Sequence, residues 1–267
     1  MTASDEDARS GSSSARARRA GREVILELAF RPLSNLLVPV LRRIGVAPPA
    51  VVLANAAVGL AAAAVLARGE LVAAALLLQV KTLLDNTDGQ LARATGRVTL
   101  AGRYLDTVAD LVVNAAVFVA LGYVTDQPML AAAGFVALTL VLAADYNVTE
   151  LYREAHGSPT PRPASTGGRA ELALARIYAV VFAPLDRAFR ALAANRFGSG
   201  GGYDRVTVTA LANLGLSTQL VVLGVFLVLD LPGGYLWFLL GCLLALVPTQ
   251  LRAERQARQT APRSVTR

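Results

Sequence analysis

The chain has 267 residues, 54% of them hydrophobic, and its mean hydropathy of +0.49 excludes an ordinary soluble globular domain and favours a protein of the lipid bilayer. The formal net charge is +7, and because the arginines flank apolar segments without an aromatic-interleaved basic platform, this charge suits anionic lipid better than nucleic acid. The single cysteine, Cys242, excludes a disulfide framework and has packing as its default role.

The N-terminal part of the chain divides into two segments. Residues 1–21 are rich in Ser, Ala and Arg, lack the apolar core of a signal peptide, and are expected to form a disordered basic arm. From residue 22 to Ile44 apolar residues recur at helical period, interrupted by Pro32 and Pro39. This pattern predicts an amphipathic helix that lies in the membrane interface.

Six later segments are long and apolar enough to cross a bilayer, which needs about 20 helical residues. Arginines cluster before the first span and after the second, fourth and sixth, whereas only Arg68 lies on the opposite side. By the positive-inside rule both termini are expected in the cytoplasm. The predicted spans are 49–67, 71–94, 100–124, 129–152, 206–229 and 233–251. The expected fold is therefore an all-α membrane protein with six transmembrane helices.

A long connection, residues 154–204, separates the fourth and fifth spans. It begins with a Pro/Gly/Ser-rich linker that contains His156, the only histidine, and continues with an apolar face opposite arginines. We expect a second amphipathic helix here, lying in the cytoplasmic interface. The alternative is a seventh span, which would place the C-terminus on the arginine-poor side. Residues 22–252 then form the membrane domain, followed by a basic tail, residues 253–267.

Four aspartates lie at the inner ends of the second and third spans, where charge is costly. Asp85 and Asp88 are three residues apart, and Asp106 and Asp110 are four apart, so each pair shares a helical face. A short turn between the spans would bring both pairs together. Convergent carboxylates repel one another unless cations neutralise them, and Mg²⁺ and Mn²⁺ prefer oxygen ligands. The sequence therefore predicts a divalent metal site.

Small residues accompany these acids. Gly89 and Ala92 lie on or near the face of the first pair, and Gly102 lies one turn before Asp106. Small side chains leave room for a flat or bulky ligand against the helix backbone. They are also common where membrane helices pack together, and the sequence leaves both interpretations open.

Together these residues form the signature D-x2-D-G-x2-A-R-x8-G-x3-D-x3-D, complete from Asp85 to Asp110. The chain resembles the CDP-alcohol phosphatidyltransferase family, and the resemblance extends over most of residues 22–252. It implies that Asp85, Asp88, Asp106 and Asp110 bind metal, as two Mg²⁺ or Mn²⁺ ions, and that Asp110 is the catalytic base. It also implies that Gly89, Ala92, Arg93 and Gly102 shape the nucleotide pocket, and that the protein is a homodimer.

One departure concerns the start of the first span. Family members often have Pro-Asn followed by Thr there, where this chain has Pro48, Pro49 and Val52. Asn55 is a candidate to complete the nucleotide pocket, and an interhelical hydrogen bond is the alternative for it.

Several further polar residues are candidates for contacts with the acceptor substrate. Lys81 shares the face of Asp85 and Asp88 and is a candidate phosphate or acceptor contact, with snorkelling or a structural ion pair as the alternative. Arg103 is a candidate for an anionic acceptor or for an interfacial anchor. Asp145, Asn147 and Glu150 either line an acceptor pocket or mark where their helix leaves the membrane.

The resemblance implies transfer of a substituted phosphate group from a CDP-alcohol to an acceptor hydroxyl, with release of CMP. Arginine-dominated usage favours a prokaryotic cytoplasmic membrane, and hence CDP-diacylglycerol with a small alcohol acceptor in phospholipid biosynthesis. A CDP-polyol or CDP-amino-alcohol donor remains open. From another class, a divalent cation transporter explains the acids but not the Gly/Ala/Arg pattern. The expected partners are the two substrates and membrane lipids, with no nucleic acid.

Overall fold

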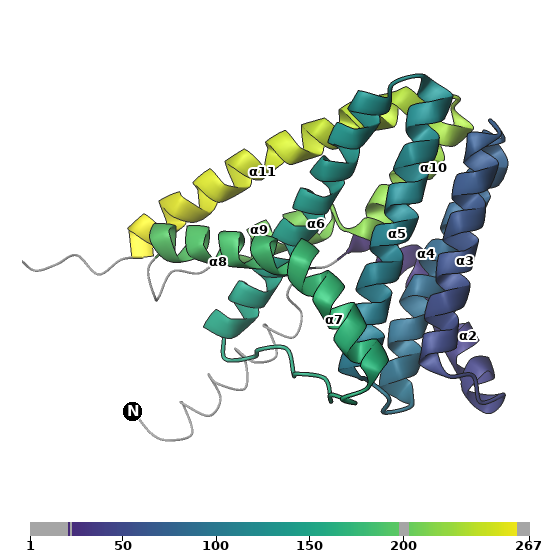
Figure 1. Ribbon diagram of the computed structural model, residues 1–267. Coiled ribbons are helices and arrows are strands. Elements are labelled where there is room, and N and C mark those ends of the chain that lie inside the picture. Colours follow the sequence, from purple (N-terminus) through teal and green to yellow (C-terminus); the bar gives the residue numbers. More distant parts are fainter. Residues whose placement is uncertain (1–20, 22, 198–202, 261–267) are drawn as a thin grey trace, which may run out of the picture.

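The computed structural model describes residues 21, 23–197 and 203–260, and these form helices joined by turns (Figure 1). The predicted basic arm, apart from Gly21, and residues 261–267 of the predicted tail lie outside the described part. The elements are η1 Leu26–Phe30, α2 Arg31–Arg43, α3 Pro48–Ala67, α4 Leu71–Ala94, α5 Leu100–Thr125, α6 Pro128–Ala155, α7 Arg169–Val181, α8 Ala183–Phe197, α9 Arg205–Ala212, α10 Leu216–Val228 and α11 Pro232–Thr260.

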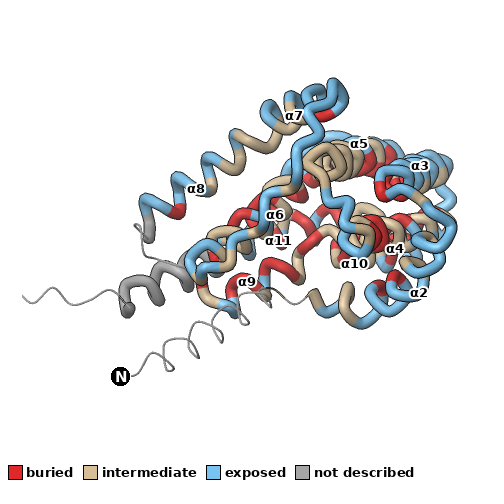
Figure 2. Tube along the Cα trace, turned by 90° about the horizontal axis from the view of Figure 1, so that it is seen from below, coloured by how far each residue is buried: buried red, intermediate tan, exposed pale blue. Residues whose placement is uncertain are grey.

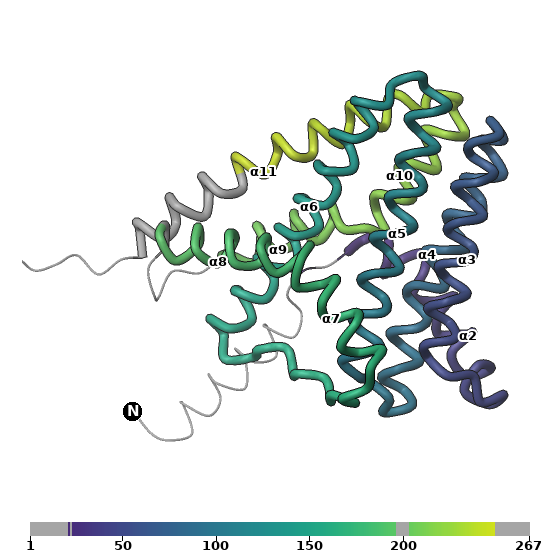
Figure 3. The backbone as a smooth tube through the Cα atoms, in the orientation of Figure 1, coloured from purple at the N-terminus to yellow at the C-terminus, as the bar shows by residue number. Residues whose placement is uncertain are grey.

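The turn between α4 and α5 is defined by local chemistry. Gly96 adopts a positive φ of 66°, which a residue without a Cβ tolerates easily, and reverses the chain. Thr99 then takes an extended conformation and caps α5 by accepting a hydrogen bond from the Gly102 amide. Because the turn is short, the two helices run antiparallel, and the end of α4 lies beside the start of α5 (Figure 3).

The helices pack as one bundle around an apolar core. Helix α3 packs against α4 and α5, α10 packs against α4, and α6 packs against α5 and α11. Figure 2 shows the buried residues gathered between these helices, whereas α7 and α8 lie at the edge of the bundle and are largely exposed. Contact between α3 and α5 depends on Gly59, where a Cβ would come within 2.4 Å of Val113 Cγ1.

Large apolar side chains also cover the outside of the bundle, including Leu53, Val119 and Met129. An apolar outer surface of this kind suits lipid. Within the described residues α3, α5 and α6 are long and apolar enough to cross a membrane, and α9 with α10 qualify as one bent span. Helix α4 carries more charge than an ordinary span, and α11 is apolar only over Pro232–Pro248.

Two segments that the sequence predicted as single helices are each divided by a break in the structure. The predicted fifth span, 206–229, is divided into α9 and α10, which meet at an angle of 44°. The predicted single helix of the insertion is divided at Phe182 into α7 and α8. Pro184 accounts for the second break, because it has no amide hydrogen to donate to the preceding turn. Helix α11 also continues beyond the predicted span end, residue 251, to Thr260.

Candidate active site

The four signature aspartates come from two antiparallel helices, Asp85 and Asp88 from α4 and Asp106 and Asp110 from α5. Asp85, Asp88 and Asp106 each offer one carboxylate oxygen, and these three oxygens lie within 4.8 Å of one another. Asp88 Oδ2 and Asp106 Oδ1 are buried and have no hydrogen-bond partner among the described residues. Three converging carboxylates, two of which have a buried oxygen without a partner, fit a hard divalent cation such as Mg²⁺ or Mn²⁺.

Asp110 is held differently, by Lys81. The fully buried Lys81 Nζ donates a hydrogen bond of 2.8 Å to Asp110 Oδ1 and lies 3.6 Å from Asp85 Oδ1. Asn55 Nδ2 donates to the same Asp85 oxygen at 3.0 Å. The structure therefore gives Lys81 an ion pair with two of the acids, and it gives Asn55 a hydrogen bond between α3 and α4. Neither residue is among those that line the nucleotide-side cavity described below.

Replacing Lys81 by Met is expected to destabilise the metal-free protein by roughly 3–5 kcal/mol, because it leaves buried carboxylates without their cation. The matched control is Arg190→Met, which removes an ion pair to Glu154 whose side chains are 46% and 42% exposed. Such a pair contributes only about 0.2–1 kcal/mol. Thermal unfolding in detergent with a metal chelator measures both losses. Equal losses in the two variants would contradict a central role for the Lys81 pair.

A cavity of about 560 Å³ opens on one side of the aspartates. Helices α4 and α5 line it with Asp88 and Asp106, and the start of α3 adds Pro48, Pro49 and Val52. We call it the donor cavity. The structure brings all four residues that the resemblance assigned to the nucleotide into this one space: Gly89, Ala92, Arg93 and Gly102.

The donor cavity is closed on one side by residues 160–164, here called the strap. The Leu100 amide donates a 2.8 Å hydrogen bond to the Ala164 carbonyl, and Thr160 Oγ1 donates one of 2.5 Å to Glu150. Arg162, at the centre of the strap, lines the cavity. The sequence indicates only a linker here, and Arg162 was not predicted as a site residue, because nothing local indicates that the strap returns to the start of α5.

The end of the strap is fixed by α7. Glu171 accepts hydrogen bonds from the Ser165 hydroxyl and from the Thr166 amide and hydroxyl. The Ser165 hydrogen bond, supported by those of Thr166, lowers the pKa of the Glu171 carboxyl below its usual value. The charged carboxylate therefore holds the segment between strap and helix in place at neutral pH, and this contribution fades as pH falls through the lowered pKa.

A smaller cavity of about 280 Å³ lies on the other side of α5. Asp106 and Asp110 line it, and the insertion supplies Tyr178, Phe182 and Asp186. We call it the acceptor cavity. Asp106 and Arg103 line both cavities, whereas Asp88 lines only the donor cavity and Asp110 only the acceptor cavity. The aspartate cluster thus stands where the two spaces meet.

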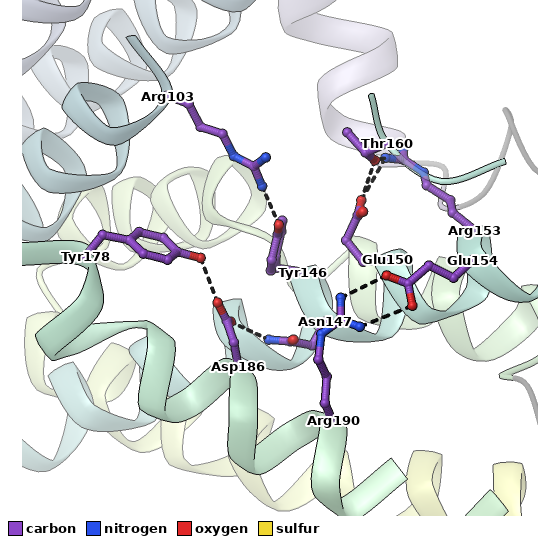
Figure 4. A network of polar contacts seen from close by, with 10 residues as sticks. All are labelled: Arg103, Tyr146, Asn147, Glu150, Arg153, Glu154, Thr160, Tyr178, Asp186 and Arg190. Carbon is purple, nitrogen blue, oxygen red and sulfur yellow. Dashed lines mark hydrogen bonds and ion pairs between the residues drawn. The ribbon is translucent and has the colours of Figure 1, made fainter. Parts of the chain in front are cut away.

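Figure 4 shows the polar contacts beside the acceptor cavity. Arg103 donates a hydrogen bond to the Tyr146 hydroxyl and also lies over its ring, 5.4 Å from the centroid. Asp186 accepts hydrogen bonds from the Tyr178 hydroxyl at 2.6 Å and from Asn147 Nδ2 at 2.8 Å. These contacts join α5 to α6, α6 to α8, and α7 to α8.

The polar residues of α6 therefore have separate positions. Asn147 binds Asp186 of α8, and Glu150 binds the strap through Thr160 and pairs with Arg153. Asp145 Oδ1 is buried without a hydrogen-bond partner among the described residues. Asp145, Asn147 and Glu150 do not line the acceptor cavity.

Glu23, which precedes η1, is a further half-buried acid that the sequence did not predict. Burial raises the pKa of its carboxyl to about 7, and the charges of Asp145 and Asp85 add to the effect. Glu23 lies far from these acids in sequence, so no spacing pattern connects them.

A family model described as CDP-alcohol phosphatidyltransferase matches residues 46–246. The matched segment contains every residue that lines the two cavities. No curated protein and no solved structure matches the chain.

Proposed function

The chain belongs to the CDP-alcohol phosphatidyltransferase family, and we propose that its site transfers a substituted phosphate group from CDP-diacylglycerol to the hydroxyl of a small acceptor alcohol, with release of CMP. One observation carries this proposal: two separate cavities meet at the aspartate cluster. A transfer between two substrates needs a space for each, with the reacting groups held where the spaces join.

The donor cavity suits the cytidine diphosphate part. Glycine and alanine on the wall let a flat base approach the helices, and Arg93, Arg97 and Arg162 supply positive charge for a diphosphate. The Pro48, Pro49 and Val52 wall is apolar where the family usually has polar residues, so contacts to the base fall more heavily on α4, α5 and the strap.

Asp85, Asp88 and Asp106 would hold Mg²⁺ or Mn²⁺, with Asp110 beside them to complete the expected ligands of two ions. The bound metal supplies positive charge that neutralises the diphosphate and the departing CMP. The protein's own part is to orient the donor. Arg103, which lines both cavities, can hold an anionic oxygen of either substrate at their junction.

Asp110 is the proposed general base. It lines the acceptor cavity, and Lys81 fixes its Oδ1, which leaves Oδ2 to take the proton of an acceptor hydroxyl. The deprotonated oxygen then attacks the phosphorus that carries the alcohol, the bond from that phosphorus to the CMP oxygen breaks, and the proton stays on Asp110 until it passes to solvent.

We further propose that the chain crosses a prokaryotic cytoplasmic membrane six times and works as a homodimer. Helix α4 serves as the second span because its charges have internal partners, the α9–α10 pair as the fifth and α11 as the sixth. The arginine distribution then places both termini and the active site in the cytoplasm. Reaction of an impermeant external reagent with a cysteine placed at Ser158, but not at Asp126, would contradict this orientation.

The proposed reaction is tested by CMP release from purified protein with Mg²⁺ and CDP-diacylglycerol, supplied with serine, glycerol 3-phosphate, inositol phosphate or no acceptor. We expect CMP only when an acceptor is present. CDP-ethanolamine with diacylglycerol tests the alternative donor. Mg²⁺ uptake into proteoliposomes without CMP release from any pair would contradict the proposal and favour a cation transporter.

Replacing Arg162 by Ala is expected to weaken binding of CDP with Mg²⁺ about tenfold, because one charge-assisted contact to phosphate, worth roughly 1.5 kcal/mol at an exposed position, is lost. The matched control is Arg169→Ala, seven residues later and also exposed, which does not line the cavity. Calorimetric titration with CDP measures both. Equal CDP affinity in the two variants would remove the strap from the donor site.

A further inference from the structure

The walls of the acceptor cavity are unusually aromatic. Phe135 and Tyr146 of α6, Tyr178 of α7 and Phe182 all line it. The Tyr178 and Phe182 rings stack, with centroids 5.5 Å apart and planes at 28°. Aromatic faces carry negative potential and attract cations.

A carboxylate stands beside these rings. Asp186 lines the same cavity and accepts its hydrogen bonds from two neutral groups, Tyr178 and Asn147. The ion pairs of the described residues do not include Asp186. Its carboxylate therefore lies at the cavity wall with both oxygens held by neutral donors. No cation of the described residues lies within ion-pair distance of it, and Arg190 interacts with it only at longer range.

The other charged residues that line the cavity are Asp106, Asp110 and Arg103. Among the described residues that line it, Arg103 is the only cation, and its guanidinium already contacts Tyr146. A phosphorylated acceptor would bring two negative charges against one arginine and an additional carboxylate. An acceptor with a positive group would instead be attracted, because the carboxylate of Asp186 and the faces of the aromatic rings both bind cations.

We propose that the acceptor cavity binds an ammonium group through Asp186, Tyr178 and Phe182, while the hydroxyl or phosphate end of the same substrate lies at Asp110 and Asp106. This inference rests on the proposed function and specifies its substrate class. Arg103, across the cavity, can bind a carboxylate when the substrate is a zwitterion. This gives the insertion between α6 and α9 a role in substrate binding. Tyr178 of α7, Asp186 of α8 and Phe182 between the two helices supply all three ammonium contacts.

The ammonium group can enter on either substrate. An amino alcohol acceptor, such as serine or ethanolamine, would carry it next to the attacking hydroxyl. A CDP-amino-alcohol donor would carry it next to the phosphate that is transferred, with a lipid alcohol as acceptor. On the acceptor the ammonium lies two carbons from the attacking oxygen. On the donor it lies two carbons from the ester oxygen of the phosphate that is transferred, so the same wall can serve both.

The experiment compares CMP release for matched pairs. With CDP-diacylglycerol the acceptors are L-serine, ethanolamine, glycerol and glycerol 3-phosphate, and a fifth arm combines CDP-ethanolamine with diacylglycerol. We expect CMP only in arms that contain an ammonium group. L-serine above ethanolamine would assign the carboxylate to Arg103, and activity confined to the fifth arm would place the ammonium on the donor.

The contribution of Asp186 is tested with Asp186→Asn, which keeps the shape and removes the charge. We expect KM for the ammonium-bearing substrate to rise about tenfold with little change in kcat, as when a charge-assisted contact becomes neutral. The control is Glu154→Gln, because Glu154 also joins α6 to α8, through Arg190, but does not line the cavity. Its KM should stay at the wild-type value.

The outcomes separate this inference from the proposed function. CMP release with glycerol 3-phosphate or glycerol, but in no ammonium arm, would overturn the ammonium site and leave the transferase in place. Equal rises of KM in Asp186→Asn and Glu154→Gln would also overturn it, since both changes would then act by loosening α8. Absence of CMP from every arm would overturn the proposed function itself.

Discussion

Replacing Asp110 by Asn is expected to lower kcat for CMP release by about 100- to 10,000-fold, the usual contribution of a general base. The carboxamide has nearly the same shape, and its oxygen can still accept the hydrogen bond from Lys81. It cannot take a proton from an acceptor hydroxyl. Because Asp110 lines the acceptor cavity and not the donor cavity, affinity for CDP with Mg²⁺ should fall much less than kcat, by no more than the loss of one expected metal ligand accounts for. Single-turnover CMP release and calorimetric titration with CDP measure the two quantities.

Asn114→Asp supplies a control in the same cavity, one helical turn further along α5. It adds a carboxylate of the same size, so it tests whether any nearby carboxylate can replace Asp110. The double variant with Asp110→Asn should remain inactive, since Asn114 is not paired with Lys81 in the native arrangement. A single Asp110→Asn variant with near-normal turnover would remove the base assignment, and an equal loss of CDP affinity would instead make Asp110 a donor-site residue.

Replacing Asp106 by Asn is expected to reduce CMP release and the apparent Mg²⁺ affinity by more than about 100-fold, since changes even to residues behind metal ligands cost 10- to 100-fold. Asp106 is one of the three clustered carboxylates and the one that lines both cavities. Without metal the effect on stability is the opposite: the variant should be at least as stable as the wild type, because the charge of a buried carboxylate with an unpartnered oxygen is removed. Thermal unfolding across a Mg²⁺ titration measures both effects.

The control for this variant is Asp145→Asn. Asp145 also has a buried oxygen without a partner among the described residues, but it lies on α6 outside the cluster. Mg²⁺ should stabilise this control as it stabilises the wild type, because ligand binding to the folded state alone raises its stability. Equal stabilisation of Asp106→Asn by Mg²⁺ would show that the cluster is not the metal site.

Local spacing was enough to predict the centre of the site. Asp85 and Asp88 on one face, Asp106 and Asp110 on the next helix and a turn too short for anything but an antiparallel pair together require the acids to meet. The position of Lys81 four residues before Asp85 allowed the ion pair that the structure contains, although its shortest contact, with Asp110, depends on how the two helices pack.

The periphery of the site could not be predicted in the same way. The strap reaches Leu100 from 64 residues further along the chain, through one backbone hydrogen bond whose chemistry any residue could supply. Asp186 and Tyr178 become cavity residues only because α7 and α8 fold back over α5 and α6. Hydrophobic periodicity predicts a helical insertion, but it does not indicate which side of the bundle the insertion covers.

The most direct test of the account follows the oxygen atoms. The reaction is run with CDP-diacylglycerol, Mg²⁺ and the acceptor that supports CMP release, in water enriched in heavy oxygen, and both products are weighed by mass spectrometry. The account predicts one phosphodiester for each CMP and no heavy oxygen in either, because the acceptor hydroxyl attacks the phosphorus. Heavy oxygen in CMP or in phosphatidate would show that water is the nucleophile, and the protein would then be a hydrolase.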